Sequence, residues 1–272
     1  MRNAWLSLLA LCPWAVLAQF PLGEELGHQS LRIVNQQAAS GPGEGHLEFF
    51  IQHRFGDFAQ GAYNAFGLDQ SQIRLGLDYG LSDRLTLGLA RSSWGKTSNG
   101  YFKYQLAGLR ENRHWDLTWL SDVSVNGEAS NVWGLEPFYY SHRLRYVHQL
   151  IVGRRWTPRF YAAVVPGVVH INLVDAASDP NDLLTLSAFA RYRVQPHINL
   201  TWEMQNTLPS VSGAALTSPP MALGMEFIEG LHIFQLSLGN ALSMNEAYIS
   251  TANQGEWNAA HLRVGFNIVR RW

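Results

Sequence analysis

Hydrophobic and polar residues alternate along most of this chain, and the pattern is clearest over its last eleven residues, 262–272. One face of that segment is apolar as far as Ile268, the other is mainly polar, and the segment ends in Trp272. A period of two residues is typical of a β-strand with one apolar face. Outer-membrane barrels end in such a strand, and interfacial aromatic rings lie at the membrane–water boundary. The segment therefore predicts the closing strand of a membrane barrel.

The same alternation occurs in eleven earlier segments, so that about twelve strands are expected. They are 47–54, 72–79, 84–94, 101–108, 114–125, 139–153, 160–169, 183–194, 197–205, 221–227 and 231–239. Residues 160–169 are apolar on both faces, and their sides cannot be assigned.

Connections between these segments alternate in length. Short ones cover 80–83, 109–113, 154–159, 195–196 and 228–230, whereas long ones cover 55–71, 126–138, 172–182, 206–220 and 240–258. Tight turns at one end and long loops outside are typical of outer-membrane barrels. We therefore predict an all-β fold, an antiparallel up-and-down transmembrane β-barrel over residues 46–272 with both termini periplasmic. A soluble sandwich or lipocalin-like barrel also alternates, but with its apolar face inward.

Aromatic residues gather at the predicted strand ends, where they would form two girdles at the membrane interfaces. Tyr79, Trp115, Trp156, Tyr192 and Trp272 fall at the short-turn end, and Trp94 and Trp257 at the long-loop end.

The N-terminus has the features of a secretory signal peptide, residues 1–18. Arg2 is followed by the apolar stretch from Ala4 to Leu17 and by a small-residue cleavage site at Ala18. The single cysteine, Cys12, lies inside this peptide, so the mature chain has no disulfide or thiolate chemistry. Residues 19–45 are predicted to be a periplasmic lead-in. Within them, 31–35 form either a short extra strand or a segment tucked into the barrel mouth.

Charge adds a prediction about the barrel interior. The formal net charge of −1 gives no reason to expect a nucleic-acid partner. If the apolar faces contact lipid, the polar faces line the lumen with Glu48, Arg54, Arg74, Asp78, Lys103, Asp116, Asp122, Arg143, Arg145, Arg191, Arg193, Glu203, Glu226 and Arg263. Closure of the barrel is expected to bring Glu48 near Arg263. These charges either satisfy one another as a polar core or line a pore or a solute-binding cavity.

The histidines and one aromatic loop carry further expectations about sites. The ten histidines lack metal-ligand spacing, so no metal site is predicted. Ser141 and His142 are neighbours, and adjacent strand residues point to opposite faces, so they form no catalytic pair. The aromatic loop at 55–71 either constricts the barrel or forms an outer contact surface.

Several short stretches resemble a family of exported bacterial outer-membrane β-barrel proteins of unknown function. They are His53-Arg54-Phe55-Gly56, Gly67-Leu68-Asp69, Gly76-Leu77-Asp78-Tyr79-Gly80 and Arg91-Ser92-Ser93. The similarity extends over most of the mature chain and is densest over 30–110. It implies an outer-membrane barrel of this size and supplies no catalytic residue.

Three functions follow as hypotheses. The first is passage or binding of small polar solutes through a charged lumen in the outer membrane of a Gram-negative bacterium. The second is a structural barrel that scaffolds a periplasmic or surface partner, and the third is a barrel hydrolase acting on lipid or peptide. Expected partners are outer-membrane lipid, small polar solutes and, through the C-terminal strand, the barrel assembly machinery. No cofactor is expected, and an enzyme is the less favoured interpretation.

Overall fold

The computed structural model describes residues 30–107, 114–177, 179–208, 218–252 and 255–272. The predicted signal peptide, residues 1–18, lies outside the described residues. In the part that is described, no helix is long and apolar enough to cross a membrane.

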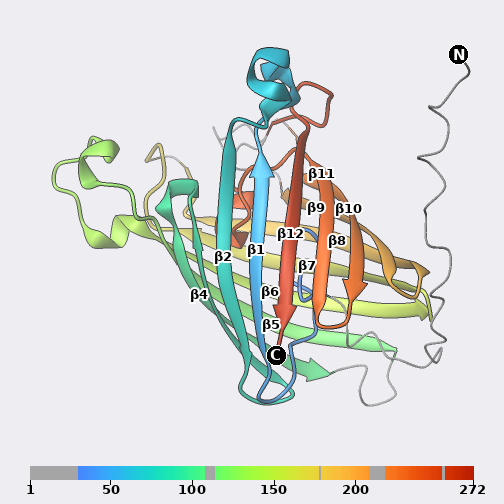
Figure 1. Cartoon of the computed structure of the whole chain (residues 1–272). Coiled ribbons are helices and arrows are strands. Elements are labelled where there is room, and N and C mark those ends of the chain that lie inside the picture. Colours follow the sequence, from blue (N-terminus) through green and yellow to red (C-terminus); the bar gives the residue numbers. More distant parts are fainter. Residues whose placement is uncertain (1–29, 108–113, 178, 209–217, 253–254) are drawn as a thin grey trace, which may run out of the picture.

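Twelve antiparallel strands form one closed barrel in which each strand pairs with its sequence neighbours and β1 pairs with β12 (Figure 1). The strands are β1 (Leu47–Phe55), β2 (Ser71–Gly80), β3 (Leu85–Ser92), β4 (Ser98–Ala107), β5 (Trp115–Val125), β6 (Leu144–Thr157), β7 (Phe160–Ile171), β8 (Asp182–Gln195), β9 (Ile198–Thr207), β10 (Met221–Glu229), β11 (His232–Gly239) and β12 (Arg263–Arg271). The predicted fold class, an antiparallel up-and-down barrel, is confirmed.

Short helical turns occupy the connections. They are η2 (Phe58–Gln60), η3 (Ala62–Gly67), η4 (Trp94–Lys96), η6 (Ser130–Trp133), η7 (Tyr140–Arg143) and α1 (Glu246–Ile249). The sixth strand begins at Leu144 rather than at residue 139, because η7 precedes it.

The apolar faces of the strands point outward. In β3, Leu85, Leu87 and Leu89 alternate with inward Thr86, Gly88 and Ala90, and Leu89 is 68% exposed. Across the barrel the exposed large side chains are leucines, aromatics and other apolar residues, whereas most buried wall residues are polar or charged. A soluble barrel would have the opposite arrangement, so the lipocalin-like alternative is wrong.

Short turns and long loops lie at opposite ends, as their lengths predicted. In Figure 1 the β1–β2 connection lies at the top and the C-terminus at the lower, short-turn end. The β1–β2 loop stays outside the lumen: Phe58 and Ala59 bond to the backbone of Leu262 and Ala260, and Tyr63 is 96% exposed.

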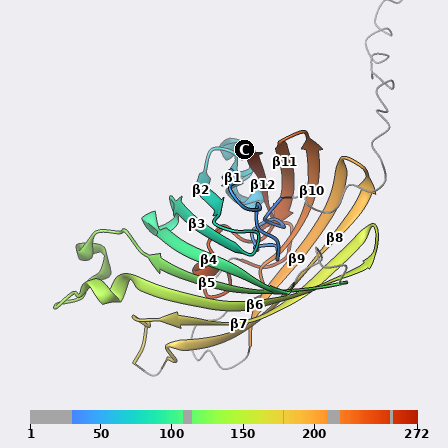
Figure 2. The same cartoon turned by 90° about the horizontal axis from the view of Figure 1, so that it is seen from below.

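Two segments of the chain lie inside the ring of strands (Figure 2). The first, residues 30–41, precedes β1 and is called here the N-terminal hairpin. The second, residues 240–252, is the first half of the β11–β12 connection and is called the inner loop. The expectation that this long connection lies outside the barrel was wrong for its first half, since residues 243–250 are buried.

Candidate functional site

The N-terminal hairpin is a tight turn that enters the barrel from the short-turn end. Ile33 N–H donates to the Gln36 carbonyl at 2.9 Å, and Ala38 N–H donates to the Leu31 carbonyl at 2.8 Å. The chain leaves at the same end, where Gly45 N–H donates to the carbonyl of Gly80 at the end of β2. Residues 30–39 are buried, so a predicted lead-in segment forms part of the interior.

A single carboxylate holds the tip of this hairpin. Glu203 of β9 is 1% exposed and accepts hydrogen bonds from three consecutive backbone N–H groups, those of Val34 (3.2 Å), Asn35 (3.0 Å) and Gln36 (3.0 Å). The side-chain amide of Asn35 adds a fourth bond at 2.7 Å. Hydrogen bonds to a charged acceptor are shorter and stronger than neutral ones. Glu203 therefore acts as a clamp that joins the wall to the hairpin.

The carbonyl of Val34 receives donors from the other side of the barrel. Gln52 Nε2, Arg54 Nη2 and Asn267 Nδ2 donate to it at 3.0, 3.1 and 2.8 Å. These donors come from β1 and β12, so the hairpin spans the lumen between this seam and β9.

An ion pair fixes the side chain of Arg32. Its Nη1 lies 2.7 Å from Asp78 Oδ2, and Tyr101 donates its hydroxyl to the other carboxylate oxygen at 2.5 Å. The guanidinium also lies 3.5 Å from the centroid of the Phe50 ring.

Two wall glycines make room for these aromatic rings. A Cβ at Gly76 would lie 2.3 Å from Phe50 Cζ, and one at Gly88 would lie 2.1 Å from Tyr101 Cε2. Glycine in a strand interior often marks such a close approach.

The opposite wall holds the hairpin by apolar packing. Ile33, Ala38 and Ala39 form one buried cluster with Ile151, Tyr161, Ala163, Val165 and Phe189 of β6–β8. This contact explains why β7 is apolar on both faces: one faces the outside and the other faces the hairpin.

The inner loop fills the long-loop half of the lumen. Arg74 of β2 donates to the Met244 carbonyl at 2.5 Å and pairs with Glu246 at 3.0 Å. Arg145 of β6 donates to Thr251 Oγ1 at 2.9 Å and lies 4.1 Å from the centroid of the Tyr248 ring.

Most predicted lumen residues contact these two segments or one another. Lys103 donates to the Ser40 carbonyl at 2.9 Å, and Arg191 bonds both the Ser30 carbonyl at 3.0 Å and Glu226 at 2.9 Å. The other buried wall carboxylates, Asp116 and Asp122, are 5% and 1% exposed.

Three predicted lumen residues lie near strand ends, and a fourth, Arg143, lies outside the strands. Glu48 pairs with Arg271 at 2.6 Å, so its expected proximity to Arg263 was wrong. Arg263 lies at the other end of β12 and pairs with Asp57 at 2.6 Å. Arg143 lies in η7 and donates to the Asn126 carbonyl at 3.0 Å, outside the strands. Arg193 is only half-buried, at the short-turn end of β8.

The predicted interface aromatics are exposed at strand ends or loops, with one exception. Tyr79, Trp115, Trp156, Tyr192, Trp257 and Trp272 are between 37% and 57% exposed. Trp94 instead packs on a loop-end cluster that includes Val147 and Tyr248.

Histidines form two pairs on the outer wall that sequence reasoning missed. Cross-strand register places Ser121 opposite His148, with Ser121 Oγ 2.7 Å from His148 Nδ1. His170 Nδ1 lies 2.7 Å from Asp182 Oδ1. Among the described residues, no three His, Cys, Asp or Glu side chains are grouped to hold a metal ion.

A closed barrel with an apolar exterior and a charged interior defines the class: a membrane β-barrel. The family described as "Membrane bound beta barrel domain (DUF5777)" matches residues 28–272, and the chain belongs to this family.

Comparison with solved structures gives the same fold. The NanC porin superposes with a TM-score of 0.51 at 8% sequence identity, covering 82% of this chain and 97% of that one. The KdgM porin gives a TM-score of 0.48 at 7% identity, covering 84% and 98%. A search of curated proteins finds no significant match.

Proposed function

We propose that this protein is an outer-membrane channel of a Gram-negative bacterium that passes small polar solutes, and that its N-terminal hairpin and inner loop close the lumen at rest. The observation that carries the proposal is the set of charged wall groups whose partners lie on these two segments. Asp78 pairs with Arg32, Arg74 pairs with Glu246, and Glu203 binds hairpin backbone.

A wall built only for stability would pair its charges across neighbouring strands, as Glu48 and Arg271 do. Here the charges face the N-terminal hairpin and the inner loop. Each of these segments is covalently attached at only one end of the barrel. Water or a solute can replace hydrogen bonds of this kind when the segment leaves. Displacement would therefore leave a polar, charged passage through the barrel.

The wall charge favours anions in that passage. The inward cations are Arg54, Arg74, Lys103, Arg145, Arg155, Arg191, Arg193, Arg263 and Arg271, and the inward carboxylates are Glu48, Asp78, Asp116, Asp122, Glu203 and Glu226. Because cations outnumber carboxylates, the open lumen is expected to prefer anionic solutes.

Planar-bilayer recording tests the proposal with the mature chain and a variant in which residues 30–40 are deleted and residues 243–250 are replaced by a short Gly-Ser linker, so that neither segment closes the lumen. We expect few openings from the mature chain and frequent ohmic steps from the variant. A variant that folds, judged by its altered gel mobility before heating, but stays silent would refute the channel and favour the scaffold.

A second candidate function rests on the outer-wall pair of Ser121 and His148. The Trp119 indole donates to Ser121 Oγ at 3.0 Å, and the same oxygen lies 2.7 Å from His148 Nδ1, within reach of a proton transfer. Such a pair supports acyl-ester hydrolysis, in which Ser121 Oγ attacks the carbonyl carbon and passes its proton to His148. His148 then protonates the departing alcohol, and water releases the acid from the serine ester.

A fluorophosphonate probe distinguishes this activity from a structural hydrogen bond. Labelling should occur in the wild type and disappear in Ser121→Ala and His148→Ala. An unlabelled wild-type barrel would eliminate the hydrolase.

A further inference from the structure

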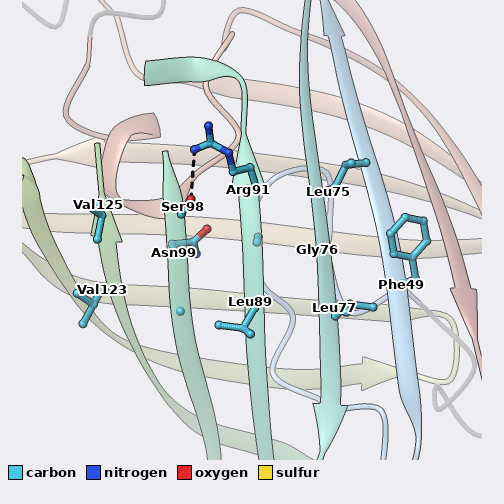
Figure 3. Close-up of a pocket in the computed structure, with 12 residues that line it drawn as sticks. Phe49, Leu75, Gly76, Leu77, Leu89, Arg91, Ser98, Asn99, Val123 and Val125 are labelled. Atoms are coloured by element: carbon cyan, nitrogen blue, oxygen red, sulfur yellow. Dashed lines mark hydrogen bonds between the residues drawn. The ribbon is translucent and has the colours of Figure 1, made fainter. Parts of the chain in front are cut away.

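The outer wall has a hollow over β1–β5, with a volume of about 550 Å³ (Figure 3). Its apolar lining includes Phe49, Leu77, Leu89 and Val123. Cross-strand register aligns Phe49, Leu77, Leu89 and Val123 in one row across the wall, and the hollow exists because the β4 position of this row, Gly100, has no side chain. Register places Gly100 between Leu89 of β3 and Val123 of β5, and the glycine leaves the space open.

One end of the hollow is cationic. Arg91 is exposed near the long-loop end of β3, and its Nη1 donates to Ser98 Oγ at 3.2 Å and to the Lys96 carbonyl. These bonds hold the guanidinium at the edge of the hollow while its other N–H groups remain available. In the described part of the chain, no carboxylate forms an ion pair with Arg91. The neighbouring Lys96 forms an ion pair with Glu128 at 3.5 Å, so Arg91 is the cation that the hollow presents.

We infer that this hollow binds one phosphorylated lipid from the leaflet at the long-loop end, with an acyl chain over Gly100 and the phosphate on Arg91. An apolar hollow in a lipid-facing wall is filled by hydrocarbon, and an acyl chain that fits its shape gains van der Waals contacts along its length. Arg binds phosphate through paired N–H groups. The charge of Arg91 and the apolar hollow together select an amphiphile with an anionic head group. This site lies on the outer wall, so it does not depend on whether the lumen conducts.

Native mass spectrometry of the intact barrel, purified in mild detergent and titrated with phosphatidic acid, tests the inference. We expect one bound lipid in the wild type and at least a tenfold weaker adduct with phosphatidylcholine. Arg91→Gln removes the phosphate contact and should weaken phosphatidic acid binding by about tenfold or more, the effect of one charge-assisted hydrogen bond. Gly100→Leu fills the hollow, excludes the acyl chain, and should also weaken binding.

Arg270→Gln is the matched control, because Arg270 is also an exposed outward arginine but lies at the short-turn end of β12. It should bind phosphatidic acid as the wild type does. Equal retention by all four proteins, or no adduct at all, would overturn the inference. A dimer that is lost in Gly100→Leu would also overturn it, because a second copy would then be the occupant.

Discussion

The clamp formed by Glu203 offers the sharpest test of a hairpin that can be displaced. Glu203→Gln keeps the shape of the side chain but replaces one acceptor oxygen with a donor group that faces backbone N–H groups. At least two of the four hydrogen bonds are then lost or weakened. A hydrogen bond to a charged group contributes about 1.5–3 kcal/mol, so docking of the hairpin should weaken by about 3 kcal/mol.

That change corresponds to a roughly 100-fold increase in the ratio of displaced to docked hairpin. Thiol labelling of a cysteine introduced by Ala38→Cys reports it, whether or not the inner loop still closes the other half of the lumen. Ala38 is 3% exposed, and the only native cysteine lies in the predicted signal peptide. Labelling should be slow in the Ala38→Cys protein and about 100-fold faster when Glu203→Gln is added, if the displaced state is the reactive one.

Glu48→Gln is the control, because Glu48 is equally buried but pairs with Arg271 across the seam of the wall. It should lower the stability of the barrel and leave labelling of the hairpin unchanged. If both substitutions accelerate labelling to the same extent, the carboxylate of Glu203 has no specific role in holding the hairpin.

Three further predictions concern other parts of the interior. Arg74→Gln breaks the buried ion pair with Glu246, which should lower the stability of the docked inner loop by about 3–5 kcal/mol and speed its amide hydrogen exchange. Unchanged exchange at 244–249 would show that Arg74 does not hold the inner loop. Gly88→Val would collide with the Tyr101 ring and should lower the free energy of unfolding by about 1–3 kcal/mol in urea titrations, whereas an unchanged midpoint would show that the ring is not confined. In the barrel that lacks residues 30–40 and carries the linker in place of 243–250, Arg145→Gln should reduce anion preference in reversal-potential measurements. Arg143→Gln should not, since only Arg145 faces the lumen, and equal effects would show that the loop also sets selectivity.

The sequence predicted the wall of the barrel well because period-two alternation is local. The expected segment 72–79 corresponds to β2 at Ser71–Gly80, and 197–205 corresponds to β9 at Ile198–Thr207. The early start predicted for the sixth strand came from Tyr139 and Tyr140, which continue an apolar pattern although the backbone there forms a helical turn.

The contents of the lumen could not be predicted in the same way. For residues 31–35 the sequence left open an extra strand or a segment inside the barrel mouth, and the structure has the second. Residues 240–252 show neither strand nor helix periodicity, and the partners of both segments are distant in sequence, as Val34 and Asn267 illustrate. One signal was available in the pairing of the inward carboxylates. Asp78 has Glu48 and Gly88 as cross-strand neighbours, and Glu203 has Phe189 and Ala222, none of them cationic. Inward carboxylates without a basic neighbour on the adjoining strand indicate that a segment from outside the sheet enters the barrel and supplies their partners.

The path of the N-terminal hairpin also constrains the order in which the molecule is built. The hairpin precedes β1 and is therefore synthesised before any strand, yet its carbonyl at Val34 needs donors from β1 and β12 together. Those donors come into register only when the first and last strands meet. The earliest part of the domain is thus the last to reach its final position, and its docking marks the moment at which the seam has sealed.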